Sequence, residues 1–423
     1  MRTLYSIGIG LMTAAVRCAA PFHKKCKLMS EGWRHWRKNF SGDKLKEGKV
    51  AWFHVASLGE FEQARPVIET LKTKHPEYKI VLTFFSPSGY EVRKNYDKAD
   101  VICYLPPDTR SNARRLIKEI HPDIVFFVKY EFWFNYLNEL SRRGIPTYIF
   151  SAIFRDDHYF FKWHGRWFLN QLKKSFRHLF VQNETSVRLL KEHGVDNCSI
   201  AGDTRFDRVM DIASHARRFD EIEQFITDNG TRPLEEVKVL IAGSSWPPDE
   251  DNINAFLHSY NEPLKVIVAP HEIHESRLTQ IENLFGIENC IRYSSLKNKN
   301  ISDYCRKKIL IIDNIGMLSS IYRYATVAYI GGGFGKGIHN ILEAAVFGCP
   351  VCFGPNHTHF QEAMELLAYG GAMTYNDKQQ LTEILTVWLD SEEDYRKASK
   401  ACDNYMQNNV GATETIMKGI ELR

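Results

Sequence analysis

Two acidic side chains follow apolar segments in the first half of the chain, where buried parallel strands would end. Glu60 closes the segment SLGE, and Glu131 comes shortly after the apolar run 124–128. A carboxylate held in a partly dry cleft can take a proton from an attacking hydroxyl group, which is the chemistry that sugar transfer requires. Either residue could instead have a structural role, because acidic side chains stabilise the first turn of a helix. Glu131 could also form an ion pair with Lys129.

A short segment rich in hydroxyl groups follows another apolar run. Ser86, Pro87, Ser88 and Gly89 stand in sequence there. Their hydroxyls and backbone N–H groups could bind an anionic group. The structural alternative is an ordinary helix cap formed by Ser86.

The second half of the chain contains five glycines within the seven residues 331–337, followed by IHNILE. Glycine lets the backbone approach a ligand closely, and a helix that starts after these glycines would present its N-terminus to a phosphate. The dinucleotide fingerprint fits no frame here, and the Walker pattern fails because Gly337 follows Lys336. We predict a different nucleotide site, in which Glu343 accepts hydrogen bonds from ribose hydroxyls beside Asn340. The alternative is a glycine-rich connection with a solvent-facing glutamate.

Further loops are expected at the same edge of the second domain, because the carboxyl ends of parallel strands lie together. They contain Ser244 and Ser245, Pro270 and His271, the segment Asp313-Asn314-Ile315-Gly316, and residues 354–357. Each loop is a weak signal alone. Together they predict one rim of a nucleotide pocket.

The histidines and cysteines predict no metal or redox site. His271 and His274 miss the HExxH spacing by one residue, and no Asp-x-Asp motif ends a strand. The one close cysteine pair, Cys349 and Cys352, lies in an apolar run that suits buried thiols. A formal net charge of +4, without a nucleic-acid-binding signature, gives no reason to expect DNA or RNA. We therefore expect no cofactor and no nucleic-acid partner.

Short β-rich segments must position these groups. They are predicted at 50–56, 79–85, 101–105, 124–128, 146–150, 178–182 and 197–201, and again at 237–243, 264–269, 308–313, 326–332 and 350–354. Helical stretches separate these apolar segments, which predicts two doubly wound, Rossmann-like α/β domains with parallel sheets. Two such domains around a cleft form the GT-B architecture, which several kinds of nucleotide-linked enzymes share.

The domain boundaries follow from breaks in this pattern. We place the first domain at 46–205, a charged linker at 206–235 and the second domain at 236–376. The charged segment 377–423 is predicted to be helical and to pack back across both domains.

The segment 1–45 is predicted to hold the protein on a membrane. Residues 3–16 carry no charge but are fewer than the roughly 20 apolar residues of a spanning helix, and bases gather after them. The positive-inside rule then leaves the rest of the chain in the cytoplasm. Trp33, Trp36 and Phe40 recur at helical spacing, which suits a helix in the headgroup layer. The alternatives are a helix that packs these aromatics on the core, and a cleaved signal peptide.

Taken in order from about 50 to 360, the segments of this chain resemble the 3-deoxy-D-manno-octulosonic acid (Kdo) transferase family. The resemblance rests on HVASLGE (54–60), SPSGYE (86–91), YEFWFN (130–135), AGDTRFD (201–207), GGGFGKGIHNILEAA (331–345) and FGP (353–355). It implies an inverting, metal-independent glycosyltransferase that moves Kdo from CMP-Kdo to a lipid A precursor (lipid IVA) in lipopolysaccharide core synthesis. It also implies attachment to the cytoplasmic face of the inner membrane.

The resemblance implies roles for individual residues. Glu60 would be the general base, and acceptor or sugar groups would be bound by Ser57, Gly59, Ser86, Ser88, Gly89 and Glu131. The donor's CMP would be bound by Arg205, Ser244, Ser245, Pro270, His271, Asn314, Ile315, Gly316, Gly332, Gly333, Lys336, Asn340 and Glu343. Pro270 stands where the family usually has an arginine that helps to hold phosphate, so Lys336 and Arg205 are expected to replace it.

Two other functions fit the same sequence. One is a GT-B transferase that uses a UDP-sugar on a membrane lipid, and it would bind UDP better than CMP. The other is a non-catalytic nucleotide-binding protein at the membrane surface, which would form no product on a lipid A precursor.

Overall fold

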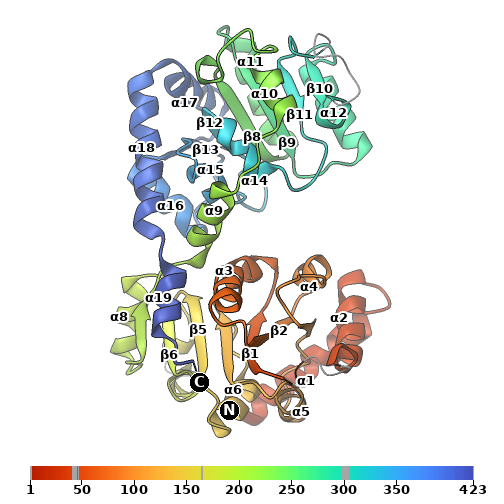
Figure 1. Cartoon of the computed structure of the whole chain (residues 1–423), viewed down its shortest axis with the longest axis vertical. Coiled ribbons are helices and arrows are strands. Elements are labelled where there is room, and N and C mark those ends of the chain that lie inside the picture. Colours follow the sequence, from red (N-terminus) through yellow and green to blue (C-terminus); the bar gives the residue numbers. More distant parts are fainter. Residues whose placement is uncertain (1, 41–44, 46, 163–164, 297–303, 423) are drawn as a thin grey trace. The chain divides into compact units, whose positions relative to one another are not determined.

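The computed structural model describes residues 2–40, 45, 47–162, 165–296 and 304–422. The chain forms two compact units, one made of Met1–Arg208 and Asn409–Arg423 and the other of Val209–Asn408 (Figure 1). Each unit contains one seven-stranded sheet in which every ladder is parallel. The prediction of two doubly wound parallel sheets is therefore confirmed.

In the first unit, the strands lie in the order β3-β2-β1-β4-β5-β6-β7. They are β1 (Lys49–Val55), β2 (Tyr78–Phe84), β3 (Val101–Tyr104), β4 (Ile124–Val128), β5 (Thr147–Ala152), β6 (His178–Val181) and β7 (Cys198–Ile200). The helices include α3 (Leu58–Lys74), α4 (Pro87–Arg93), α5 (Arg110–Ile120), α6 (Phe134–Arg142), α7 (Arg166–Ser175), α8 (Glu184–Glu192) and α19 (Ala412–Gly419). The boundary between the two units, after Arg208, falls within α9 (Thr204–Ser214). Apolar clusters cover both faces of this sheet, one under α5, α6 and α7 and the other under α3 and α19. That double burial explains why its strands are apolar throughout.

The second unit repeats this plan with the strand order β10-β11-β9-β8-β12-β13-β14. Its strands are β8 (Val239–Ser245), β9 (Lys265–Pro270), β10 (Cys290–Arg292), β11 (Ile309–Ile311), β12 (Val327–Ile330), β13 (Val351–Phe353) and β14 (Ala372–Thr374). Its longer helices are α10 (Asp220–Ile226), α11 (Pro247–Ser259), α12 (Glu275–Phe285), α16 (Gln361–Tyr369), α17 (Lys378–Asp390) and α18 (Glu392–Asn409). The sequence did not predict β10 and β14. Each has only three residues and lies at an edge of the sheet, so neither produces a recognisable run of apolar residues.

The boundaries of the units differ from the predicted domains. The expected linker, 206–235, is divided at Arg208, and most of it belongs to the second unit. Helix α10 within it buries Ile222, Phe225 and Ile226, so its charged residues form the outer face of a packed helix. In the C-terminal segment, α17 and nearly all of α18 belong to the second unit, whereas α19 belongs to the first.

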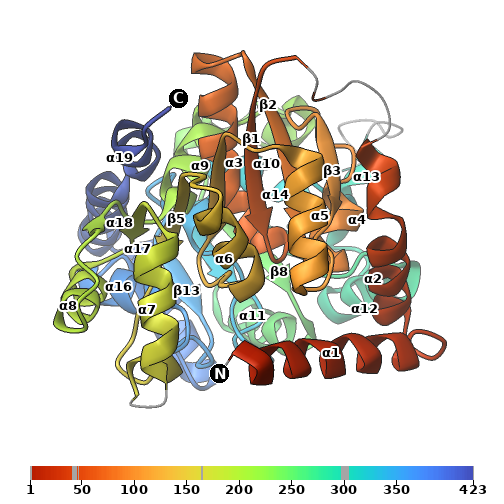
Figure 2. The same cartoon turned by 90° about the horizontal axis from the view of Figure 1, so that it is seen from below.

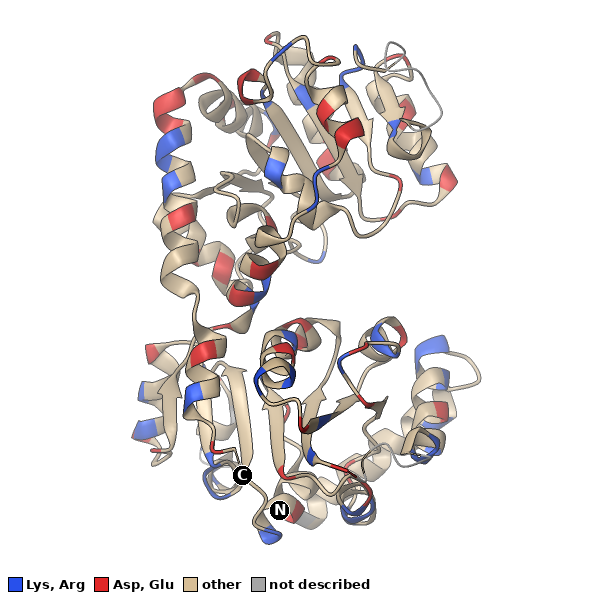
Figure 3. Ribbon diagram, viewed as in Figure 1, with Lys and Arg blue, Asp and Glu red and all other residues tan. Residues whose placement is uncertain are grey.

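The N-terminal segment forms two helices, α1 (Arg2–Ala19) and α2 (Lys24–His35), followed by a 3-10 turn, Trp36–Phe40. Figure 2 shows α1 and α2 meeting at a sharp bend. By length and composition no single helix among the described residues could cross a membrane, whereas the bent pair Thr3–Ala19 and Lys24–Phe40, at 118°, passes that test. Basic side chains lie on α2 rather than along most of α1 (Figure 3).

The expected lipid-facing aromatic stripe on α2 is wrong. Trp33 and Trp36 are each only 6% exposed, and Phe40 packs on the core of the first unit. Gly32 explains this close packing, because a Cβ there would lie 2.1 Å from the Tyr104 ring. The aromatics therefore fix α2 to the protein instead of to lipid.

Both sheets change direction at their centre. In the first unit the chain leaves β1 toward β2 on one side and returns to β4 on the other, and in the second β8 lies between β9 and β12 in the same way. In open parallel sheets, ligands bind beside the carboxyl ends of the strands at such a switch point. These two edges are therefore where functional groups are expected.

Candidate functional site

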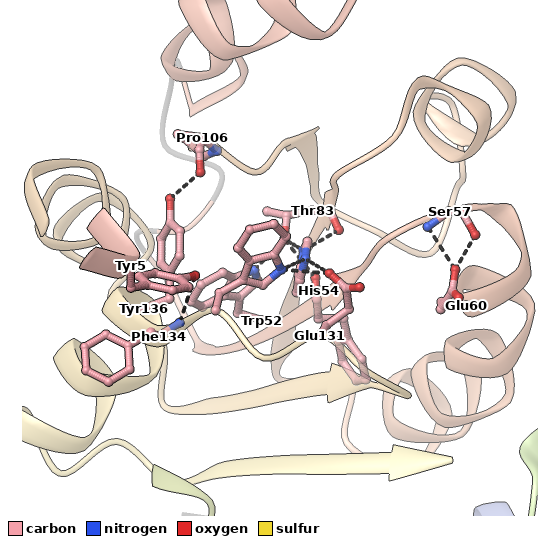
Figure 4. Close-up of polar contacts among 12 residues, drawn as sticks. Tyr5, Trp52, His54, Ser57, Glu60, Thr83, Pro106, Glu131, Phe134 and Tyr136 are labelled. Carbon is pink, nitrogen blue, oxygen red and sulfur yellow. Dashed lines mark hydrogen bonds and ion pairs between the residues drawn. The ribbon is translucent and has the colours of Figure 1, made fainter. Parts of the chain in front are cut away.

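Glu60 lies at the carboxyl end of β1, in the first turn of α3. Its carboxylate accepts hydrogen bonds from the Ser57 backbone N–H (3.1 Å) and the Ser57 hydroxyl, which forms a capping box (Figure 4). The structure thus gives Glu60 the helix-start role that the sequence left open, while it keeps the carboxylate half-buried at the switch point. Gly59 is exposed, and a Cβ there would meet only the Ser57 hydroxyl, at 3.8 Å.

The Ser86–Gly89 segment lies against the same connection. Ser86 donates its backbone N–H to Ala56, at 2.7 Å, and caps α4 by accepting from the Ser88 N–H. Gly89 is required by sterics, since a Cβ would lie 2.4 Å from the Phe84 ring and 2.9 Å from the Ser57 carbonyl carbon. The structure therefore brings Ser57, Ser86 and Gly89 together, and Ser88 is exposed beside them.

Glu131 forms a hydrogen-bonded cluster with two residues that sequence reasoning did not select. Its Oε2 accepts from the Trp133 indole N–H at 2.7 Å and lies 3.0 Å from His54 Nε2 (Figure 4). His54 is fully buried, whereas the Glu131 side chain is 14% exposed. Lys129 takes a positive φ of 62° at the end of β4, a conformation that a non-glycine residue adopts at a cost and that places the connection at this edge.

A signal for His54 existed in the sequence. Val50, Trp52 and His54 alternate along β1 and therefore share one face of the sheet, where Val50 and Trp52 lie in the apolar core. A histidine that ends such a row must find hydrogen-bond partners inside the protein. A polar residue in this otherwise apolar row is the signal that would have identified His54 as a candidate.

Behind this cluster, Asp108 ties α1 to the start of α6. It accepts hydrogen bonds from the Tyr5 hydroxyl (2.7 Å) and from the backbone N–H groups of Asn135 (2.9 Å) and Tyr136 (3.0 Å). Burial raises the pKa of Asp108 to about 6, although these donors oppose the rise. The Tyr5 hydroxyl also accepts from the Phe134 N–H at 3.4 Å, so the N-terminal helix touches the segment that carries Glu131.

In the second unit, the glycine-rich loop packs directly on neighbouring backbone at the switch point. A Cβ on Gly331 would lie 2.3 Å from the Ser244 carbonyl oxygen, and one on Gly333 would lie 2.6 Å from the Gly354 backbone. Asp249 holds the loop by accepting from the Gly332 N–H at 2.9 Å. Ser244 itself has a positive φ of 53° at the end of β8.

Three rings stack beside this loop. Trp246 and His271 lie 4.7 Å apart between ring centroids, and His271 and His339 lie 4.6 Å apart, each pair nearly parallel. The Trp246 indole N–H donates to His339 Nε2 at 3.2 Å. Burial, followed by the charge of neighbouring His271, lowers the pKa of His339. Of these three residues the sequence prediction included only His271, because ring stacking between separate loops leaves no mark in the spacing.

Two details of the predicted nucleotide cradle need correction. The helix after the glycines is a single turn, α15 (Leu342–Ala345), so it supplies no long helix dipole for a phosphate. The Ser245 hydroxyl is 1% exposed and donates to Glu250 at 2.8 Å, so it points into the protein. Asn340 and Glu343 do meet, with the Asn340 amide donating to Glu343 Oε1 at 3.0 Å.

The remaining predicted donor residues of the second unit lie in three places. Asn314, Ile315 and Gly316 form an exposed loop, and Ile315 is 89% exposed. Lys336 is exposed on the glycine-rich loop, and Pro270 ends β9 beside His271.

Arg205 belongs to the first unit. There its guanidinium contacts the nearly buried Asp203 carboxylate at 2.8 Å. Burial raises the pKa of Asp203, but Arg205 and the hydrogen bond from Gln63 together lower it below its usual value. Arg205 therefore has a structural partner of its own in that unit.

Within the described ranges, no three His, Cys, Asp or Glu side chains gather where they could hold a metal ion. Metal independence stays a prediction.

Comparison with known proteins agrees with the sequence resemblance. Residues 34–208 match the family model described as 3-deoxy-D-manno-octulosonic-acid transferase (kdotransferase). The 3-deoxy-D-manno-octulosonic acid transferase of Chlamydophila psittaci is 26% identical over 364 residues, which cover 82% of this chain and 79% of that protein. Over residues 34–208 this chain is therefore similar to the Kdo transferases. The matched segment contains Glu60, Glu131 and His54, so the acidic edge of the first unit lies inside the family region.

Solved structures of similar fold support the architecture of this chain. UDP-GlcNAc 2-epimerase from Neisseria meningitidis aligns with a TM-score of 0.58 at 16% identity, and Acinetobacter baumannii MurG aligns with 0.54 at 14%. Each alignment covers 88% of this chain and 98% of the other. The two doubly wound units therefore form a GT-B fold, as the sequence predicted. The cleft expected in such a fold stays a prediction.

Proposed function

We propose that this protein transfers Kdo from CMP-Kdo to a lipid A precursor, lipid IVA, with inversion at the anomeric carbon. The observation that carries the proposal is the pair Glu60 and Glu131 at the switch point of a sheet that lies within the family match. A transferase of this kind needs a base for the acceptor hydroxyl and a cradle for the departing nucleotide. The first unit supplies the carboxylates, and the second supplies the glycine-rich loop.

Glu60 is the proposed base. In the capping box, one of its oxygens, Oε2, accepts both hydrogen bonds from Ser57. These bonds fix the side-chain direction, and a fixed base reacts faster because less reorganisation is needed. Ser57 contacts this carboxylate, and Ser86 and Ser88 at the start of α4 add hydroxyls that suit a sugar acceptor.

The donor nucleotide is proposed to bind the second unit. The glycine-rich loop exposes Gly335 and Lys336, and Asn340 with Glu343 presents amide and carboxylate groups for the ribose. Lys336 supplies a positive charge for the phosphate, because Pro270 stands where the family usually has an arginine. The CMP leaving group carries a single phosphate, which these groups can stabilise as it departs.

Attachment to the cytoplasmic face of the inner membrane is proposed through α1. Leu4, Ile7 and Leu11 are 69%, 54% and 68% exposed and recur on one helix face. Tyr5 and Ile9 face the protein instead. An exposed apolar stripe with bases on the following helix suits the headgroup layer. Sedimentation with anionic lipid vesicles tests this, since the double variant Ile7→Glu/Leu11→Glu should remain in the supernatant and wild type should not.

The function is tested by an assay with enzymatically generated CMP-Kdo and tetraacyl lipid A, with product mass as readout. Addition of one or more Kdo masses supports the proposal, and its absence from a folded, membrane-bound sample would refute it. Competition separates the rival function: CMP should inhibit better than UDP, and the reverse order would indicate a UDP-sugar enzyme. Glu60→Gln serves as the inactive control, because glutamine keeps the capping-box acceptor.

A further inference from the structure

The two ring nitrogens of His54 have different partners: the uncharged Thr83 and the carboxylate of Glu131. On one side its Nδ1 is 2.9 Å from the Thr83 hydroxyl oxygen and 3.1 Å from the Thr83 carbonyl oxygen. On the other side its Nε2 is 3.0 Å from Glu131 Oε2 (Figure 4). The imidazole is 0% exposed, so water cannot replace either partner.

The contact with Glu131 requires a hydrogen on Nε2. An ionised carboxylate only accepts hydrogen bonds, and an indole N–H only donates. The Trp133 N–H lies near both atoms, but its contact with Glu131 Oε2 is the shorter, 2.7 Å against 3.0 Å to Nε2. One indole hydrogen cannot satisfy the histidine–glutamate contact as well, so Nε2–H must donate to Glu131.

Thr83 accommodates both charge states of the ring at Nδ1. Its hydroxyl can donate to an unprotonated Nδ1, and its carbonyl oxygen can accept from a protonated one. The Thr83 hydroxyl is itself held by the Trp52 indole N–H at 2.8 Å. His54 can therefore gain or lose a proton without leaving a buried group unsatisfied and without releasing Glu131.

We propose that His54 is a positioning residue, whose Nε2–H holds the Glu131 carboxylate at the edge of the first sheet in both charge states. Among the described residues, no side chain or N–H donates to the other carboxylate oxygen, Oε1, which leaves it for a hydroxyl of the acceptor. The role of Glu131 toward substrate rests on the proposed function. The hydrogen bond itself does not.

The groups that surround His54 favour this reading. Phe127 and Trp133 pack edge-on, with ring centroids 5.7 and 6.3 Å away. The charged groups that influence it are Glu131, from the connection after β4, and Asp108, from the connection after β3. Both are carboxylates, which accept hydrogen bonds, so neither is a donor that would take the place of Nε2–H at Glu131.

Two matched variants of His54 distinguish a role in positioning Glu131 from a general role in folding. Gln places its amide nitrogen where Nε2 stands, whereas Asn can reach only the Thr83 side. We expect His54→Gln to keep kcat within about tenfold of wild type and His54→Asn to lower it about 100-fold with little change in KM, since a displaced group of this kind costs about that much. Combined with Glu131→Gln, His54→Asn should add almost nothing further. Equal activity of His54→Asn and wild type, or full additivity, would overturn the proposal.

A measurement on the unmodified protein keeps the test independent of folding and of catalysis. In ¹⁵N-histidine-labelled wild type, His54 should show an Nε2-bound hydrogen throughout pH 5–8, and its shift should move in Glu131→Gln. A bare Nε2 anywhere in that range would refute the inference even if Kdo transfer is observed. A protein that transfers no Kdo but shows the protected Nε2–H would refute the proposed function and leave the positioning intact.

Discussion

The two units place histidine at their switch points in opposite ways. In the first, a single buried histidine contacts a carboxylate, His54 against Glu131 at 3.0 Å. In the second, two histidines stack on each other, and His339 Nε2 accepts a hydrogen bond from Trp246. An indole only donates, so His339 must be unprotonated at that nitrogen. The first edge therefore favours a hydrogen on Nε2 of its histidine, and the second excludes a hydrogen from Nε2 of His339.

This difference fits two kinds of chemistry. In the first unit, a carboxylate that is already hydrogen-bonded to an imidazole keeps a second oxygen with which it can accept a hydrogen bond from a hydroxyl group. In the second unit, the stacked rings of His271 and His339 lie next to a glycine-rich loop, whose backbone N–H groups suit an anion. The same strand plan thus carries an acidic edge in the first unit and, as we propose, an anion-accepting edge in the second.

The largest expected effect comes from Glu60→Gln. We expect it to lower kcat for Kdo transfer by about 100- to 10,000-fold, because general-base catalysis contributes that much and an amide cannot take the proton. The thermal midpoint should stay within a few degrees, since glutamine preserves the capping box. Ser57→Ala is the matched control. It should destabilise the protein by about 1 kcal/mol with a smaller loss of activity. Full activity in Glu60→Gln would remove it from the mechanism.

The sheets and their switch points could be predicted from the sequence. Strands β1, β2 and β4 are buried on both faces, so their sequences are almost continuously apolar. The positions of Glu60, Glu131 and the glycine loop at strand ends followed from those runs. The extent of the helix after the loop could not be predicted, since helical spacing in IHNILE does not reveal that α15 lasts one turn.

The partners of the site residues could not be predicted either. His54 and Thr83 are brought together by the β1–β2 register, and Trp246 meets His339 across 93 residues of chain. The burial of Trp33 and Trp36 depends on contacts with β3 and Phe85, so a spacing that suited a lipid surface was misleading. The spacing of apolar residues identifies the apolar side of a helix or strand, but it does not show whether protein or lipid covers that side.

Opposite pH dependences should sharpen the comparison. Asp108 has a pKa raised to about 6 by burial, so its stabilising contribution is full below its usual value of 3.8 and is lost as pH rises through 6. The shift corresponds to about 3 kcal/mol. His339 has a lowered pKa, so its contribution is present above 6.5 and is lost as pH falls through the folded value.

Denaturant midpoints measured from pH 4 to 8 check this. Relative to wild type, Asp108→Asn should gain stability as pH rises toward 7, and His339→Gln should gain it as pH falls. Glutamine keeps an acceptor for the Trp246 N–H, so the pH-independent loss of stability in His339→Gln should be small. If both variants showed slopes of the same sign, the contrast between the two edges would not hold.

Glycine 331 tests the anion-accepting edge directly. Gly331→Ala places a Cβ 2.3 Å from the Ser244 carbonyl oxygen, so the loop must move. We expect a loss of about 1–3 kcal/mol in stability and at least about tenfold weaker CMP binding by calorimetric titration. Gly335→Ala is the control, because its nearest neighbour would be 3.6 Å away. Equal effects of the two variants would mean that loop position does not matter for the nucleotide.

The smallest expected effect compares two tyrosines with the same hydrogen-bond pattern, one in each unit. Tyr5 donates to Asp108 and accepts from the Phe134 N–H, and Tyr324 donates to Glu223 and accepts from the Phe219 N–H. Asp108 is fully buried, whereas the Glu223 side chain is 21% exposed and bridged by Arg218. We expect Tyr5→Phe to cost about 2 kcal/mol and Tyr324→Phe about 1 kcal/mol or less, since a buried carboxylate that loses a donor cannot turn to water. Denaturant unfolding measures both, and a larger cost for Tyr324→Phe would show that burial does not set the difference.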